Sequence, residues 1–215
     1  MDYKDELKSI IDTYYKDILE EYKVTTTAAT KDGKKLGLFR KVKYEGHIAG
    51  FEKHGADAKV LISRAEAVEV PEDDENGQDL KAKLEQSLDD FVELCDRNVE
   101  YYRIMDKKQR AGSGVTVDDF KLALAGANSG MITSVNSLRD LDLSLKVFNG
   151  ELSAEELAAL NDKEEQDGYE DEIPDEDKSY INLYDEDDEE NDGVAEEASM
   201  KPNLYRKQEF EDDEE

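Results

Sequence analysis

The chain has 215 residues, of which 57 are acidic and 28 basic, and its formal net charge is −29. Its single cysteine, Cys95, excludes an internal disulfide framework and fits a reducing compartment. No apolar run approaches the roughly 18 to 20 residues that cross a membrane, and the charged N-terminus is unlike a signal peptide. We therefore expect a cytoplasmic protein without a membrane partner.

The first region, 1–78, combines features of a helix and of a small β-structure. Apolar residues recur at steps of three and four over 3–22, which predicts an amphipathic helix. Three consecutive threonines at 25–27 then favour an extended chain. Alternating apolar residues over 36–44, followed by a return over 47–51, predict a β-hairpin.

The next segment, 56–70, fits two structures. Its valines and isoleucine suit a strand, whereas its alanines and leucine recur at helical spacing, and Pro71 ends the segment in either case. The sequence leaves this segment open between strand and helix.

A long amphipathic segment, 79–110, opens the second region, 79–160. No proline or glycine interrupts it, and as a helix it would be about 48 Å long. A small core cannot cover that length, so the helix needs a partner from the same chain or from another copy. The expected helix-packing face, shared with a helix at 132–148, consists of Leu84, Leu88, Phe91, Cys95, Val99, Tyr102, Leu138, Leu141 and Leu145.

Two shorter helices accompany this helical hairpin. Capping residues predict one helix over 116–124, which the glycine-rich segment 126–130 separates from the helix at 132–148. A second capping box opens a helix over 153–160. The expected fold class is mainly α with a small β-hairpin: a long helical hairpin core with an N-terminal amphipathic helix and a disordered acidic C-terminal tail.

The tail, 161–215, carries most of the charge imbalance. It holds 25 acidic and 5 basic side chains, a net of −20, whereas residues 1–160 hold 32 and 23, a net of −9. So much charge with so few aliphatic residues predicts disorder. The tail repeats Asn-Leu-Tyr beside acidic runs, a pattern typical either of a docking peptide or of chance in a biased segment. The residues that would bind a partner are Leu183, Tyr184, Asp185, Glu186, Asp187, Asp188, Leu204 and Tyr205.

The sequence contains no pattern typical of a catalytic, metal or nucleotide site. The only histidines, His47 and His54, fall in the expected hairpin without cysteines at zinc spacing, and we interpret both as surface residues. The aspartates of the tail lack the spacing of a calcium loop. We therefore expect a protein that is not an enzyme and has no cofactor and no metal site.

One basic segment, 31–43, stands out in this acidic chain. It carries six basic residues against one aspartate, and Leu38, Phe39 and the adjoining Tyr44 interleave with those charges. Cations contact phosphates and aromatic rings stack on bases, so nucleic-acid binding is one interpretation. A lysine-bearing edge strand is the other. The residues that would contact nucleic acid are Lys34, Lys35, Arg40, Lys41 and Lys43.

Two functional hypotheses follow from these features. The first is a non-catalytic acidic interaction or assembly protein, whose helical body forms a homo-oligomer or docks on a partner. Its polyanionic tail would engage or compete for the basic surface of a partner protein. The second is a nucleic-acid-handling oligomer, such as a small DNA-packaging or replication-assembly subunit of a virus, that uses segment 31–43.

Overall fold

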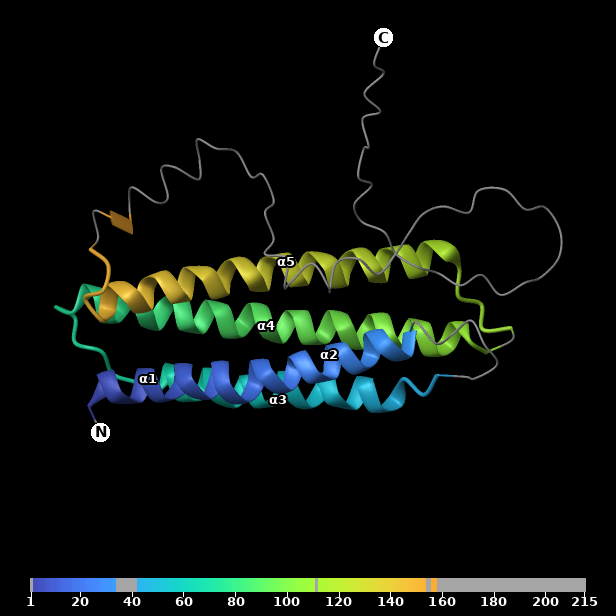
Figure 1. Ribbon diagram of the computed structural model, residues 1–215, viewed down its shortest axis with the longest axis horizontal. Helices are drawn as coiled ribbons and strands as arrows, with labels where there is room; N and C mark the ends of the chain where they lie inside the picture. Colours follow the sequence, from blue (N-terminus) through green and yellow to red (C-terminus); the bar gives the residue numbers. More distant parts are fainter. Residues whose placement is uncertain (1, 34–41, 111, 154–155, 158–215) are drawn as a thin grey trace, which may run out of the picture. The chain divides into compact units, whose positions relative to one another are not determined.

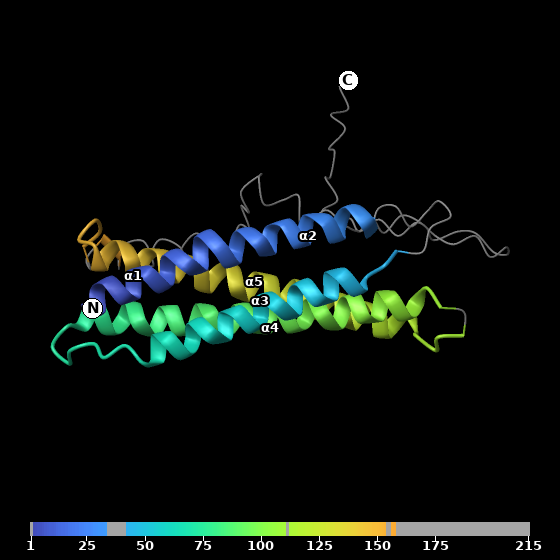
Figure 2. The ribbon, with the colours of Figure 1, turned by 90° about the horizontal axis from the view of Figure 1, so that it is seen from below.

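The computed structural model describes residues 2–33, 42–110, 112–153 and 156–157, and this part of the chain is mainly helical, with no strand. The chain divides into two units, one of 1–29 with 43–169 and one of 30–42 with 170–215. The helix packing lies in the first unit. In it, α4 runs between α5 and α3, and the N-terminal helices lie alongside α3 (Figures 1 and 2).

The N-terminal helix is longer than the sequence predicts. It comprises α1 (Tyr3–Thr13), a π-helical turn η1 (Tyr14–Leu19) and α2 (Glu20–Gly33) without interruption. The expected break at 25–27 was wrong. The hydroxyl of Thr26 donates a hydrogen bond to the carbonyl of Tyr22 at 2.9 Å, and the side chain is buried. Packing of this kind overrides the weak helix propensity of threonine.

The expected β-hairpin is also wrong where the structure describes it. Residues 47–51 lie within α3 (Glu45–Glu66), while 34–41 lie outside the described residues. The same helix settles the ambiguity over 56–70 as helix up to Glu66. The reason is a buried helical face whose members recur at steps of three and four: Phe51, His54, Ala58, Leu61 and Ala65.

The long helix predicted over 79–110 is present as α4 (Glu75–Lys108) and begins one turn earlier. Asp74 caps it by accepting a hydrogen bond from the amide of Gly77 at 3.0 Å. The hydroxyl of Tyr3 also donates to Asp74, which ties the start of α1 to the start of α4. Both α3 and α5 pack along α4, so this chain supplies the partners that such a long helix requires.

The last helix, α5 (Val117–Phe148), is continuous through 126–130, where a break was expected. Glycine ends helices when it adopts positive φ, but here it brings two helices together. A Cβ on Gly130 would lie 3.4 Å from the Cα of Leu94 in α4. The capping box of α5, formed by Thr116 and Asp119, agrees with the helix start that the sequence predicts at 116. Of the helix expected over 153–160, only 156–157 are described, and Ser153 caps them through Glu156.

Candidate functional site

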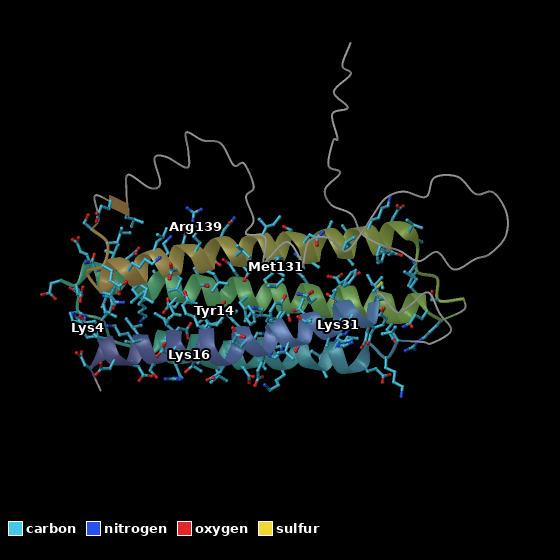
Figure 3. All side chains as sticks on the ribbon, in the orientation of Figure 1. Lys4, Tyr14, Lys16, Lys31, Met131 and Arg139 are labelled. Carbon is cyan, nitrogen blue, oxygen red and sulfur yellow. The ribbon has the colours of Figure 1, made fainter. Side chains whose placement is uncertain are left out.

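The expected helix-packing face is largely the core of the first unit. Leu84, Leu88, Phe91 and Leu141 are completely buried, and Cys95, Val99 and Tyr102 are nearly so. Tyr14 and Tyr22 each set a ring edge-on against Phe91, with centroids 5.6 and 5.2 Å apart. Figure 3 shows Tyr14 inside this packing and Arg139 on the outer side of α5. This face is therefore covered by helices of the same chain.

Two expected residues of that face, Leu138 and Leu145, are only half-buried. The side of α5 that meets α4 consists instead of mostly small residues in a heptad pattern: Phe120, Ala123, Ala127, Gly130, Ser134, Ser137, Leu141 and Ser144. Small side chains let the two backbones approach closely. Several large apolar side chains of α5 lie off this side and are exposed.

Most of the large apolar side chains that are exposed among the described residues lie on α5. Six large apolar side chains are exposed in the described part of the chain. Four of them belong to α5: Val117, Leu122, Ile132 and Val135. Leu122 is 76% exposed, Ile132 60% and Val135 52%. We call the solvent-exposed side of α5, whose large apolar members between 122 and 138 are Leu122, Ile132 and Val135, the outer face of α5.

The outer face of α5 also lacks charge. Between Lys121 and Arg139, 17 consecutive residues contain no acidic or basic side chain, in a chain that is 40% charged. This interval is visible in the sequence, although the periodicity of apolar residues does not reveal it. Exposed apolar patches with a polar surround mark interaction sites.

The other expected site residues fall mainly outside the described residues. These comprise Lys34, Lys35, Arg40 and Lys41 of the basic segment and the partner-binding residues of the tail. Lys43 is described, and it is an exposed residue two positions before α3.

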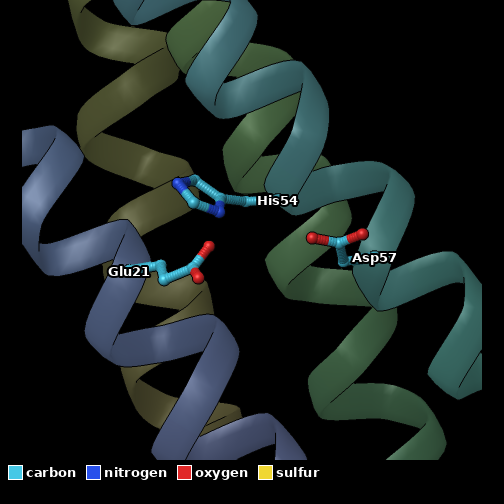
Figure 4. Close-up of side chains that lie close together, drawn as sticks. All are labelled: Glu21, His54 and Asp57. Carbon is cyan, nitrogen blue, oxygen red and sulfur yellow. The ribbon is translucent and has the colours of Figure 1, made fainter.

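A second feature lies between α2 and α3, where Glu21, His54 and Asp57 converge (Figure 4). Each offers a nitrogen or oxygen atom, and these atoms lie within 4.8 Å of one another. His54 is only 3% exposed, so its interpretation as a surface residue was wrong. The hairpin assignment hid this arrangement, because only a helix places His54 and Asp57 on one face, three residues apart.

The charges around His54 are partly compensated. Lys53 lies 2.5 Å from the Oε2 of Glu21 and 3.2 Å from the Oδ2 of Asp57. The hydrogen bond and charge of Lys53 lower the pKa of Glu21, and the pKa of Lys53 is raised in turn. Burial, together with the charge of Lys53, lowers the pKa of His54. The imidazole is therefore neutral near pH 7.

Comparison with protein-family models, with curated protein sequences and with solved structures found no match to this chain. Within the described residues, none of the helices combines the length and the apolar character that crossing a bilayer requires.

Proposed function

We propose that this chain is a non-catalytic acidic assembly protein that self-associates through the outer face of α5. The observation that supports this most directly is the exposure of Leu122, Ile132 and Val135 on a helix surface without charge. Covering such side chains removes apolar area from water, at about 25 cal/mol for each Å².

The occupant that the charges favour is a second copy of this chain. Each copy carries a net charge of −29, so two copies repel each other over most of their surfaces. An uncharged face is where they can approach without desolvating carboxylates. Two α5 helices would pair antiparallel in an isologous dimer, which places opposite ends of the helix dipoles together.

Light scattering behind a sizing column tests this proposal with a matched pair of variants. We expect the wild-type chain to show at least twice its chain mass of 24.4 kDa. Ile132→Glu should be monomeric, whereas Val60→Glu should keep the wild-type mass. Val60 is the control because it is 61% exposed, like Ile132 at 60%, but lies on α3. A monomeric wild-type chain would contradict the proposal.

The tail supplies the second part of the proposed function, engagement of a basic surface. Its net charge of −20 over 161–215 provides the charge density and length that competition for a basic groove requires. Polylysine is a suitable probe. Replacing Asp185, Glu186, Asp187 and Asp188 by their amides should weaken its binding at low salt. Binding unchanged by that substitution would contradict this part.

Segment 31–43 favours a second candidate function, a nucleic-acid-handling oligomer of the DNA-packaging or replication-assembly type. Six basic residues against one acidic residue support it. In that case Lys34→Gln with Lys35→Gln should weaken binding of a DNA duplex, and affinity should fall steeply as salt rises. Self-association through α5 should instead become stronger as salt rises, because salt screens the repulsion between copies. The salt dependence therefore separates the two candidates.

A further inference from the structure

We propose that Glu21, His54 and Asp57 form a binding site for a divalent transition-metal ion, with zinc as the representative ion. Two carboxylates and one imidazole are the ligand types that zinc accepts, and three protein ligands leave a fourth position for water. Figure 4 shows the carboxylate of Glu21 facing the ring of His54 from α2, and the carboxylate of Asp57 beside it on α3. The proposal is independent of the outer face of α5.

The hydrogen bonding of His54 points to a ligand at this position. The hydroxyl of Thr25 donates its only proton to the carbonyl of Glu21 at 3.1 Å. With that proton committed, we assign the contact of 2.8 Å between Nε2 of His54 and this oxygen as a hydrogen bond that Nε2 donates. The proton of the neutral ring is then on Nε2, and Nδ1 carries a free lone pair.

That lone pair has no partner among the described residues. Nδ1 of His54 is buried and makes no hydrogen bond. A buried polar atom without a partner is costly and calls for an explanation. A metal ion on Nδ1 provides one, and the contact from Nε2–H to Thr25 then orients the ring, as an outer hydrogen bond does for most metal-bound histidines.

The distances permit coordination after small side-chain rotations. In tetrahedral zinc sites the ligand atoms lie about 3.4 Å apart, given bonds of about 2.0–2.2 Å, and here they lie within 4.8 Å. Glu21 and Asp57 are partly exposed, with 56% and 45% of their side chains accessible. They can therefore rotate inward while His54 stays in place.

Lys53 occupies the same carboxylates when no metal ion is bound. It contacts both Glu21 and Asp57, and 57% of its side chain is exposed. Lys53 is thus an internal cation that a divalent ion must displace. Removing the charge of Lys53 should strengthen metal binding. If the cluster were purely structural, the same change would leave metal binding unaltered.

Isothermal titration of the full chain with zinc chloride tests the proposal. A background of about 5 mM magnesium occupies acidic sites in the tail, because magnesium prefers all-oxygen coordination. We expect one equivalent of zinc to bind to the wild-type chain. Asp57→Asn should weaken binding at least about tenfold through loss of a ligand, and Lys53→Gln should strengthen it about fivefold. Glu52→Gln, a neighbouring exposed carboxylate on α3, should change nothing.

Nuclear magnetic resonance of the histidine ring nitrogens gives a second readout that needs no variant. Without zinc, His54 should show a protonated Nε2 and an unprotonated Nδ1. One equivalent of zinc should shift Nδ1 of His54 and leave His47 unchanged. Ring signals of His54 that stay unchanged, or equal zinc affinity in Asp57→Asn and wild type, would overturn the proposal. Calorimetric binding with unchanged ring signals would mean adsorption by other carboxylates, and this too refutes the site.

Discussion

The close approach of α5 to α4 can be tested by enlarging Gly130. A Cβ at this position would lie 3.4 Å from the Cα of Leu94, 3.6 Å from its Cδ1 and 3.6 Å from the Cγ of Arg97. Alanine therefore fits at the limit of contact. In Gly130→Leu, three further carbon atoms would meet the backbone of α4, which cannot rotate away.

The expected magnitude follows from two opposing effects. Overpacking of a well-packed core costs about 1–3 kcal/mol, and leucine recovers about 0.8 kcal/mol of helix propensity relative to glycine. We expect Gly130→Leu to lower the free energy of unfolding by about 1–2 kcal/mol. For a domain of this size the melting temperature would fall by roughly 3–6 °C.

Gly126→Ala is the matched control on the same helix. There the added Cβ would meet only the side chain of Arg97, at 3.6 and 3.8 Å, and that side chain is flexible. The substitution should stabilise the protein by about 0.5–1 kcal/mol. Urea unfolding followed by circular dichroism at 222 nm measures both variants. The reasoning is refuted if Gly130→Leu is as stable as Gly126→Ala.

Four further measurements address the core and its titrating groups. Phe91→Ala should destabilise the chain by about 3–5 kcal/mol in urea, since Phe91 is fully buried; a loss below 1 kcal/mol would contradict that packing. Because the pKa of His54 lies below 6.5 in the folded chain, the unfolded chain binds the proton first. Stability is therefore lost as the pH falls below 6.5, and the wild type should lose more of it than His54→Gln does. Equal losses in the two chains would contradict the burial of a neutral His54. Burial and the nearby Asp142 raise the pKa of Tyr15 from 10.0 to about 12. The stability that the neutral phenol supplies is therefore lost as the pH rises from 10 toward 12. Over this range Tyr15→Phe should lose less stability than the wild type. Burial also raises the pKa of the Cys95 thiol, so Ellman's reagent should react with it only on unfolding, and rapid reaction of the folded chain would disprove its burial.

Periodicity predicted α4 well because the buried face of that helix consists mainly of large apolar residues at helical spacing. Large apolar residues such as Leu84, Leu88 and Phe91 recur without glycine or proline, and they are buried. Helix α5 differs, since it turns small residues such as Ser134 and Ser137 inward and leaves Ile132 outside. Large apolar residues therefore locate the buried side of α5 only in part, because Leu141 lies on it whereas Ile132 and Val135 are exposed.

The errors in the N-terminal half have another cause. Threonines 25–27 and the glycines at 46, 50 and 55 lower the local helix propensity. For that reason the sequence predicted an extended chain and a hairpin in this region. The structure uses some of them for close packing. A Cβ on Gly50 would lie 2.9 Å from Cγ2 of Thr25, and one on Gly55 would lie 3.3 Å from Cβ of Cys95. Such contacts join residues far apart in the sequence, so local propensity cannot reveal them.

The cluster around His54 was beyond sequence reasoning for the same reason. Glu21 and Thr25 come from α2, whereas His54 and Asp57 come from α3, about 30 residues later. Neither segment alone carries a metal-binding pattern. The uncharged interval 122–138, in contrast, is visible in the sequence alone.

Disulfide crosslinking at Ile132 tests the proposed self-association most directly. Ile132 lies at the middle of α5 (Val117–Phe148), so an antiparallel pair places two copies of this residue beside the two-fold axis. Ile132→Cys should form a covalent dimer under mild oxidation, while Val60→Cys, equally exposed on α3, should not. The buried Cys95 does not interfere. Equal crosslinking of the two variants, or none in Ile132→Cys, would contradict association through the outer face of α5.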